Sequence, residues 1–190
     1  QIMSHPNNKT SLSSVDNQEI ELIVGNSSAN FSGVTSTMLQ VTSLQKHMIN
    51  LRIMGKHFVP DPSMTITFWE VAKMCRRPLS NGKWRIFHAR RVDEMIQGVI
   101  LKYVFRAKIK LVFSSAAQRK RSASTVWLSN KMDAVIAMSN RSAKYLNKPP
   151  AKINLHGVQI DNYTPAENKQ EAWQALGYGG KYGIGILGRV

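Results

Sequence analysis

A short segment, residues 84–95 with the sequence WRIFHARRVDEM, is denser in chemically capable side chains than the rest of the chain. An apolar run typical of a strand ends at Phe87 and is followed by His88, Arg90 and Arg91. A histidine can hold a ligand hydroxyl or transfer a proton, and arginine forks bind phosphate or carboxylate bidentately. Ligands of open parallel sheets bind outside the carboxyl ends of the strands, so this corner is a candidate anion or sugar site. Taken alone, the segment fits a solvated basic loop equally well.

A second polar segment, residues 26–37, follows the first apolar run and leads into a helical pattern. Gly33 allows a ligand to approach the backbone closely, and Ser32, Thr35 and Ser36 supply hydroxyl groups. Backbone N–H groups at a helix start can hold a phosphate or a carboxylate, although the glycine spacing and the lysine of a phosphate-binding loop are missing. The alternative is that the serine and threonine residues only cap the helix.

A third polar segment, residues 114–121, follows a later apolar run and ends in Arg119, Lys120 and Arg121. These side chains, with the nearby Lys131, could contact an anionic acceptor, although a solvated charge run is the commoner explanation. That explanation is weakened here, because neighbouring parallel strands would place this corner beside the first one. No cluster of His, Cys and Asp has the spacing of a metal site, so no metal is expected.

The composition is that of a strongly basic globular protein. Its 190 residues include 26 Lys and Arg against 11 Asp and Glu, which gives a net charge of +15. Such a charge favours nucleic acid, an anionic membrane surface or phosphorylated ligands as partners. The single cysteine, Cys75, excludes an internal disulfide framework and fits a reducing compartment. No apolar run approaches the roughly 20 residues of a membrane-spanning helix, while basic helices that carry Trp and Phe could lie on an anionic bilayer.

Short apolar runs alternate with longer amphipathic patterns from Ile20 onward, which predicts βαβ units and a parallel sheet between layers of helices. The runs lack period-two alternation, as expected of strands buried on both faces. Asp93 and Glu94 open one of the helices, where the helix dipole stabilises acidic side chains. The expected strands are 20–24, 51–54, 84–87, 109–113, 134–138 and 153–155, and the expected helices are 35–47, 65–76, 93–106, 125–132, 140–147 and 167–176.

The sequence changes in character along the chain, which predicts three parts. Residues 1–18 are rich in Ser, Asn and Gln and are expected to form a flexible tail. Residues 19–165 are expected to form one α/β domain. Residues 166–190 contain a helical pattern, a glycine-rich stretch and a final apolar run, and we interpret them as a linker and the first strand of a truncated second domain.

The segment 153–165, INLHGVQIDNYTP, resembles the signature that closes the N-terminal domain of the retaining family 4 glycosyltransferases, which have the GT-B fold. A strand ending in Gly-Arg follows in that family, and Gly188-Arg189 is similar to it. The resemblance extends over about residues 19–190 and is closer still to the lipopolysaccharide core mannosyltransferases of alphaproteobacteria. It implies a Rossmann-like three-layer domain with a parallel sheet, the N-terminal half of a GT-B enzyme. The segments similar to that subgroup are FSGVT at 31–35, FHARR at 87–91, VFSSAAQR at 112–119 and MDAVIA at 132–137.

The resemblance implies roles for residues at all three corners and in the last apolar run. His88 and Arg90 are expected near the transferred sugar as catalytic residues. The residues expected to bind the acceptor are Arg91, Glu94, Ser115, Arg119 and Lys120. Those expected to face the donor phosphates are Ser32, Gly33, Val34, Thr35, Gly188 and Arg189. Neither a metal nor a cofactor is implied beyond a nucleotide-sugar donor.

The resulting hypothesis is a retaining glycosyltransferase that moves a hexose, mannose from GDP-mannose, onto a Kdo–lipid A acceptor of the lipopolysaccharide core. Because this acceptor is polyanionic and membrane-anchored, a basic domain would concentrate at the cytoplasmic face of the inner membrane. The family's downstream residues are missing here, so the chain alone is expected to be inactive, and no nucleic-acid partner is expected. Two alternatives stay open: a basic nucleic-acid-binding module, and a non-catalytic binder of sugar nucleotides with the same fold.

Overall fold

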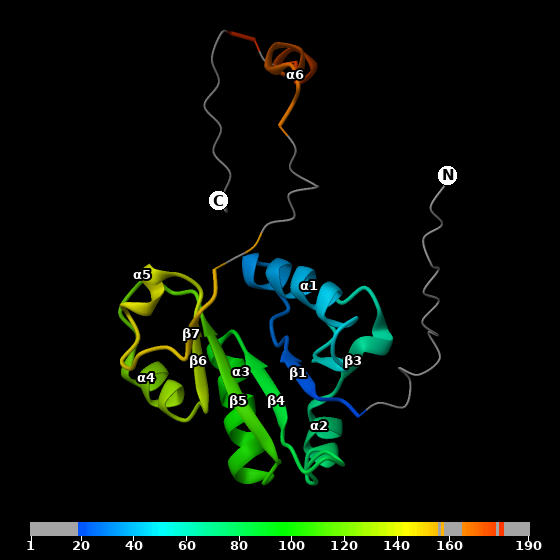
Figure 1. Ribbon diagram of the computed structural model, residues 1–190, viewed down its shortest axis with the longest axis vertical. Helices are drawn as coiled ribbons and strands as arrows, with labels where there is room; N and C mark the ends of the chain where they lie inside the picture. Colours follow the sequence, from blue (N-terminus) through cyan, green and yellow to red (C-terminus); the bar gives the residue numbers. More distant parts are fainter. Residues whose placement is uncertain (1–18, 156, 158–164, 178, 181–190) are drawn as a thin grey trace, which may run out of the picture. The chain divides into compact units, whose positions relative to one another are not determined.

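The computed structural model describes residues 19–155, 157, 165–177 and 179–180, and the chain divides after Leu155 into two units. The first unit is an α/β domain built on a sheet of seven strands (Figure 1). The second unit contains helix α6, Lys169–Ala175. The predicted α/β, Rossmann-like fold class is confirmed.

The order in which the chain adds strands to the sheet reverses next to the first strand. The strand order is β3-β2-β1-β4-β5-β6-β7, and the pairs are parallel. The chain moves outward from β1 through β2 to β3 and then continues on the other side of β1 with β4, which is a topological switch point of the kind where α/β sheets bind ligands. The strands are β1 Leu22–Gly25, β2 Leu51–Met54, β3 Thr65–Ile66, β4 Arg85–Ala89, β5 Ile109–Ser115, β6 Ala134–Ala137 and β7 Lys152–Ile153.

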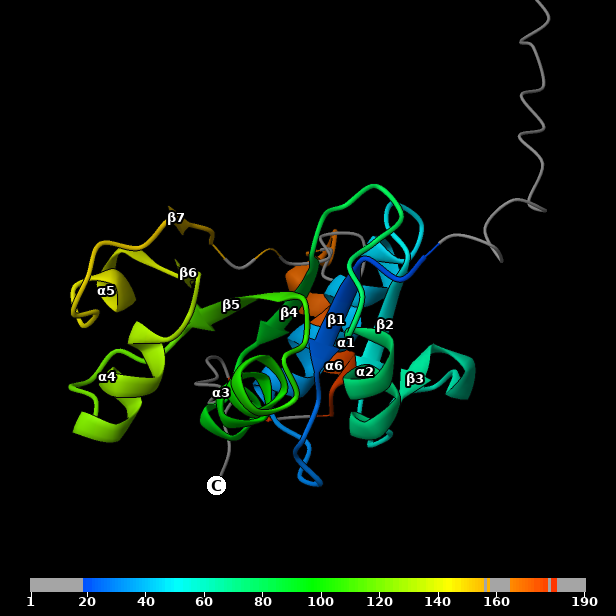
Figure 2. The same ribbon diagram turned by 90° about the horizontal axis from the view of Figure 1, so that it is seen from below.

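Helices cover both faces of this sheet. On one face Val24 of β1 packs with Met38 of α1. On the other face Ile23 packs with Val71 of α2 and Met95 of α3, and α3 lies along β4 and β5 (Figure 2). Both faces are therefore apolar, which explains why the strands read as continuous apolar runs. The helices are α1 Gly33–Gln45, α2 Phe68–Met74, α3 Val92–Val99, α4 Ala123–Asn130 and α5 Asn140–Ala143, with a 3₁₀ turn η1 at Pro62–Met64 and a π-helical turn η2 at Ile100–Val104.

The prediction of a helix over 65–76 is wrong at its start. Thr65–Ile66 pairs with β2 as the short strand β3, and the helix begins only at Phe68. The reason is a capping box, in which the hydroxyl of Thr67 accepts from the backbone of Glu70 and the Glu70 carboxylate accepts from the backbone of Thr67. Such a reciprocal pair fixes the first turn of a helix, and it leaves the two preceding residues free to extend the sheet.

The helix predicted over 93–106 is also altered, because α3 changes to the π-helical turn η2 at Ile100. There the backbone N–H of Phe105 donates to the carbonyl of Ile100 at 3.2 Å. The predicted tail 1–18 and the apolar run 186–190 lie outside the described residues. The proposed domain boundary after residue 165 stays a prediction.

Candidate functional site

A buried carboxylate, that of Glu94, lies where β1 and β4 end at the switch point. Glu94 is in the first turn of α3 and is 0% exposed. Its Oε2 accepts from the backbone N–H of Arg90 at 2.7 Å and from that of Arg91 at 3.2 Å. A side chain at Gly25, the last residue of β1, would meet Cγ of Glu94 at 2.9 Å. Glycine therefore makes room at the end of β1 for the carboxylate that holds the loop after β4.

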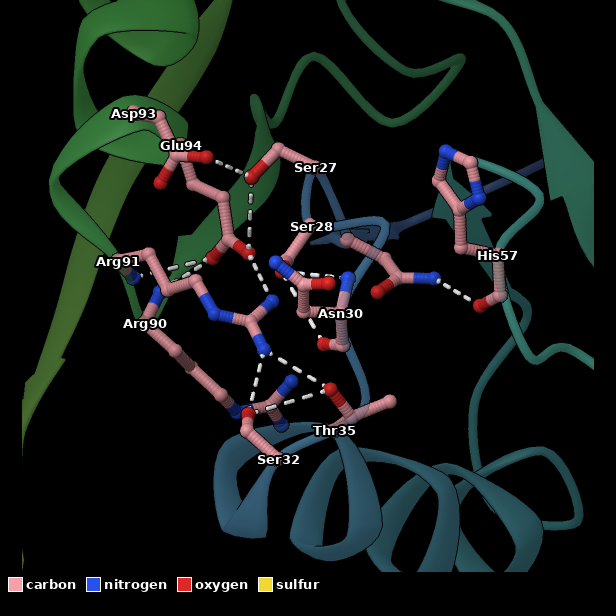
Figure 3. A network of polar contacts seen from close by, with 11 residues as sticks. Ser27, Ser28, Asn30, Ser32, Thr35, His57, Arg90, Arg91, Asp93 and Glu94 are labelled. Carbon is pink, nitrogen blue, oxygen red and sulfur yellow. Dashed lines mark hydrogen bonds and ion pairs between the residues drawn. The ribbon is translucent and has the colours of Figure 1, made fainter.

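Ser27 ties the loop after β1 to the same carboxylates. Its hydroxyl donates to a carboxylate oxygen of Asp93 and lies 3.5 Å from Oε1 of Glu94. Figure 3 shows Ser27 between the two acidic side chains at the start of α3. The two loops that flank the switch point are thus joined by side-chain hydrogen bonds.

Arg91 connects this centre to the start of α1 (Figure 3). Its Nη1 lies 3.4 Å from Oε1 of Glu94, and its Nη2 donates to Oγ of Ser32 at 2.9 Å and to Oγ1 of Thr35 at 2.8 Å. Ser32 immediately precedes α1, yet its hydroxyl caps none of the first-turn N–H groups. A helix start that its cap residue leaves open, with a guanidinium beside it, attracts phosphate or carboxylate.

Arg90 extends from the same corner and keeps unused hydrogen-bonding capacity. Its Nη1 is buried and has no hydrogen-bond partner among the described residues. The pKa of the Arg90 guanidinium lies below its usual value, because burial and the neighbouring charge of Arg91 lower it more than Glu94 raises it. A buried donor without a partner is costly, so a ligand oxygen that accepts from Arg90 would be favoured.

His88 is a neutral hydrogen-bonding group in this fold. Its Nε2 lies 2.7 Å from Oγ of Ser114 on the neighbouring strand β5. Burial lowers the pKa of His88 from 6.5 to about 3, and the charge of Arg90 acts in the same direction. The imidazole is therefore unprotonated near neutral pH, so it can orient a ligand hydroxyl but cannot start a reaction as a general acid.

The third corner is built around Arg121. This guanidinium donates to the hydroxyl of Ser115 and lies with its Cζ 5.1 Å from the ring centre of Phe113. Its Nε is buried without a partner among the described residues, and burial lowers its pKa. Arg121 is thus a packed cationic group, while its neighbours Arg119 and Lys120 are exposed to solvent.

Three residues predicted to contact a ligand are buried and already engaged in hydrogen bonds. Glu94 and Thr35 are each 0% exposed, and Ser115 is 1% exposed. Glu94 accepts from its own loop, while the hydroxyls of Thr35 and Ser115 accept from Arg91 and Arg121. In this structure the three side chains hold the loop and the arginines in position, and their roles toward an acceptor or donor stay predictions.

The other predicted residues divide between the site and its surroundings. Ser32, Gly33 and Val34 lie at the start of α1, where Ser32 contacts Arg91, and their role toward donor phosphates stays a prediction. Arg119 and Lys120 are exposed and make no contact with the buried centre. The predicted donor residues at 188–189 lie outside the described part of the chain.

Ser27 was not predicted as a site residue, and Arg121 was named among the basic residues of its corner but not among those expected to bind the acceptor. Ser27 stands among several small polar residues, and only the adjacency of β1 and β4 selects it. Arg121 is distinguished by the aromatic ring at Phe113, which lies under its guanidinium. An aromatic residue at the end of the preceding strand was the one signal in the sequence that favoured it.

Among the residues that the structure describes, no group of three His, Cys, Asp or Glu could hold a metal ion. The polar centre instead consists of arginines, hydroxyls and one buried carboxylate. The expectation that the reaction needs no metal stays a prediction. This donor set suits an anion that carries hydroxyl groups.

Comparison with known proteins adds an independent line of evidence. No family model and no solved structure matches the chain. It is 37% identical over 177 residues to the lipopolysaccharide core biosynthesis mannosyltransferase LpcC of Rhizobium leguminosarum bv. viciae, covering 92% of this chain and 49% of that protein. The chain is homologous to lipopolysaccharide core mannosyltransferases. The predicted resemblance to lipopolysaccharide core mannosyltransferases is confirmed.

A second relative agrees with the first. LpsB of Rhizobium meliloti (strain 1021), named a lipopolysaccharide core biosynthesis mannosyltransferase, is 35% identical over 178 residues, which cover 93% of this chain and 50% of that protein. The chain thus spans about half the length of the curated relatives it matches.

Replacing Glu94 with Gln should destabilise the fold strongly, since it leaves the Arg91 and Arg90 charges without their buried counter-charge. The expected loss is about 3–5 kcal/mol of unfolding free energy. Urea denaturation measures it. Glu70→Gln is the matched control, because the Glu70 carboxylate likewise accepts from the backbone N–H of the residue before its helix but is exposed; it should cost much less. Equal losses in the two variants would contradict the role given to Glu94.

The low pKa of His88 predicts how stability changes with pH. Between pH 6.5 and about 3 the unfolded chain binds a proton that the folded protein does not. Unfolding is therefore favoured as pH falls, by at most about 1.4 kcal/mol per pH unit. The stability of wild type relative to His88→Gln should decrease as pH falls from 6.5 to 4, measured by urea denaturation. Parallel stability curves would show that His88 titrates normally.

Proposed function

We propose that this chain is the acceptor-side part of a glycosyltransferase that moves mannose from GDP-mannose onto a lipopolysaccharide core acceptor with retention of configuration. The observation that carries the proposal is the pair Arg90 and Arg91 at the switch point, which we call the arginine corner. It occurs in a chain homologous to two lipopolysaccharide core mannosyltransferases. In a GT-B enzyme this edge of the sheet faces a second, donor-binding domain. The activity of the whole protein, its donor and its acceptor are parts of this proposal.

The chemistry that the site can supply is electrostatic. The negative charge that develops on a departing nucleoside diphosphate is stabilised by donors and cations already held in place. Arg91 is fixed by Glu94, Ser32 and Thr35, while Arg90 has a buried donor to spare. The neutral imidazole of His88 is suited to orient a sugar hydroxyl near these charges.

A membrane surface is the second partner that the proposal includes. No helix among the described residues is long and apolar enough to cross a bilayer. An apolar stripe on α3 and η2 begins beside Arg91 and runs away from the site, with side chains at the spacing of one helical face. Its exposed members are Val92, Ile96, Ile100, Tyr103 and Val104.

Cationic and aromatic groups flank this stripe. Lys131 lies 5.8 Å from the ring centre of Tyr103 and 5.4 Å from that of Trp127, which is 55% exposed. Apolar and aromatic side chains flanked by lysines are suited to the interface of an anionic bilayer. Docked along this stripe, the protein would hold its arginine corner at the lipid surface, where a lipid-anchored acceptor resides.

Arg90→Ala should abolish most transfer while changing stability little. The assay uses a chimera in which this chain replaces the matched segment of LpcC, supplied with labelled GDP-mannose and Kdo–lipid A. Loss of one preorganised donor to a developing charge reduces turnover by about 100-fold or more. Arg141→Ala, an exposed arginine of α5, is the control and should transfer normally. The 190-residue chain alone should transfer nothing.

Other outcomes of this assay would contradict different parts of the proposal. Transfer from a different nucleotide sugar would keep the glycosyltransferase and discard mannose. Loss of stability equal to the loss of turnover in Arg90→Ala would remove Arg90 from the site. A folded chimera that binds no nucleotide sugar, together with salt-sensitive binding of the chain to nucleic acid, would favour the nucleic-acid-binding alternative.

Ile96→Glu should weaken binding to anionic vesicles by about tenfold, because a charged side chain replaces an apolar one at the lipid contact. Co-sedimentation with phosphatidylglycerol vesicles measures the binding, and phosphatidylcholine vesicles report the contribution of lipid charge. Leu44→Glu is the matched control on α1, since Leu44 is exposed but lies on a different helix. Equal binding by both variants would show that α3 does not contact the bilayer.

A further inference from the structure

Ser114 is a buried hydroxyl that contacts the imidazole of His88 from the neighbouring strand. Nε2 of His88 and Oγ of Ser114 lie 2.7 Å apart. The register of the sheet brings them together, because β4 and β5 run parallel and His88 pairs with Val112. Side chains two residues apart in a strand share a face, so Ser114 lies on the same face of the sheet as His88, one step closer to the ligand-binding edge.

This face is the one that α1 covers. His88 is also in register with Val24 of β1, and Val24 packs with Met38 of α1. The start of α1, where the hydroxyl of Ser32 leaves the first-turn N–H groups uncapped, follows the loop after β1. His88 therefore shares its face of the sheet with the helix start that attracts an anion.

The direction of the bond between Ser114 and His88 follows from the surroundings of Ser114. Its side chain is 8% exposed, and among the described residues it makes no other hydrogen bond. A serine hydroxyl has one hydrogen to donate. If the imidazole donated to Oγ, that hydrogen would be buried without an acceptor, at a cost of about 1–3 kcal/mol. The hydroxyl of Ser114 is therefore the donor, and Nε2 of His88 is the acceptor.

This direction determines where His88 carries its own proton. The ring is neutral near pH 7, since burial lowers its pKa to about 3, and a neutral imidazole carries a proton on one nitrogen. With Nε2 accepting, that proton is on Nδ1. Nδ1 has no hydrogen-bond partner among the described residues, and it is not one of the enclosed polar atoms found there. Its N–H is thus left for an oxygen of a ligand.

We propose that Ser114 is a positioning residue that holds His88 in its Nδ1–H tautomer, so that His88 presents a fixed hydrogen-bond donor beside the arginine corner. The proposal rests on the proposed function for the reaction in which this donor acts. Because Nδ1 already carries a proton, His88 cannot act there as a general base. It instead stabilises an oxygen that gains negative charge during the reaction, as the neighbouring guanidinium groups do.

The first test is a long-range ¹H–¹⁵N correlation spectrum of the 190-residue chain at pH 7. Signals of His88 are identified by their absence from His88→Gln. Wild type should show a protonated Nδ1 and an unprotonated Nε2. Ser114→Ala should shift the ring toward the Nε2–H tautomer, because the bond that selects Nδ1–H is gone.

Ser115→Ala is the matched control for this spectrum. Ser115 is also buried on β5, but its hydroxyl contacts Arg121 rather than His88, so the His88 signals should keep the wild-type pattern. Thermal unfolding verifies that the variants fold. The wild-type spectrum decides the tautomer even where a variant does not fold.

The second test is transfer by the chimera with LpcC. Ser114→Ala should lower kcat/KM about fivefold, the value of one neutral hydrogen bond. In a His88→Gln background the same substitution should cause no further loss, because Ser114 acts through His88. Ser114→Thr keeps a hydroxyl and should restore both the Nδ1–H tautomer and most of the turnover.

Several results would overturn the proposal. These are a wild-type His88 that carries its proton on Nε2, the same tautomer in Ser114→Ala as in wild type, or independent losses from Ser114→Ala and His88→Gln. The outcome is separate from that of the proposed function. An Nδ1–H tautomer that depends on Ser114, without any transfer by the chimera, would contradict the proposed function and keep the role of Ser114 toward His88. Transfer by a chimera whose His88 is protonated on Nε2 would do the reverse.

Discussion

Burying a carboxylate costs free energy unless opposite charges and hydrogen-bond donors surround it. The site depends on the groups that offset this cost for Glu94. The carboxylate lies at the end of β1, where Gly25 leaves space for it. Two backbone N–H groups of the β4–α3 loop and the guanidinium of Arg91 surround it. One side chain therefore fixes the path of a loop, the position of an arginine and the spacing of two strand ends.

The fixed position of Arg91 has a further consequence for α1. The Nη2 of Arg91 donates hydrogen bonds to the hydroxyls of Ser32 and Thr35, and the hydroxyl of Ser32 does not cap the helix. The positive potential of the helix start and of Arg90 is therefore available to attract an anion from outside the protein. The chain carries a net charge of +15, and at this corner the guanidinium of Arg91 is held in place before a ligand binds.

The sequence predicted the strands of the sheet apart from β3 and the corners that form the candidate site, because polar residues that directly follow apolar runs mark strand ends. It also predicted that the corners after β4 and β5 are neighbours, which the bond between His88 and Ser114 confirms. It could not predict that Glu94 turns inward, because the helix dipole stabilises a first-turn acid equally well in solvent. The inward orientation of Glu94 depends on Gly25, which is distant from it in the sequence, and the close approach of the loops after β1 and β2 at Gly55 and Asn26 likewise joins separate segments.

If the buried carboxylate of Glu94 holds the loop after β4 rigidly, hydrogen exchange of two backbone amides will show it. We expect the backbone N–H groups of Arg90 and Arg91 to exchange as slowly as those within β4, although they lie beyond the strand, because both donate to Glu94. The amide of Lys83, in the exposed turn before β4, provides the fast reference. Exchange of Arg90 and Arg91 at the rate of Lys83 would mean that Glu94 does not hold the loop.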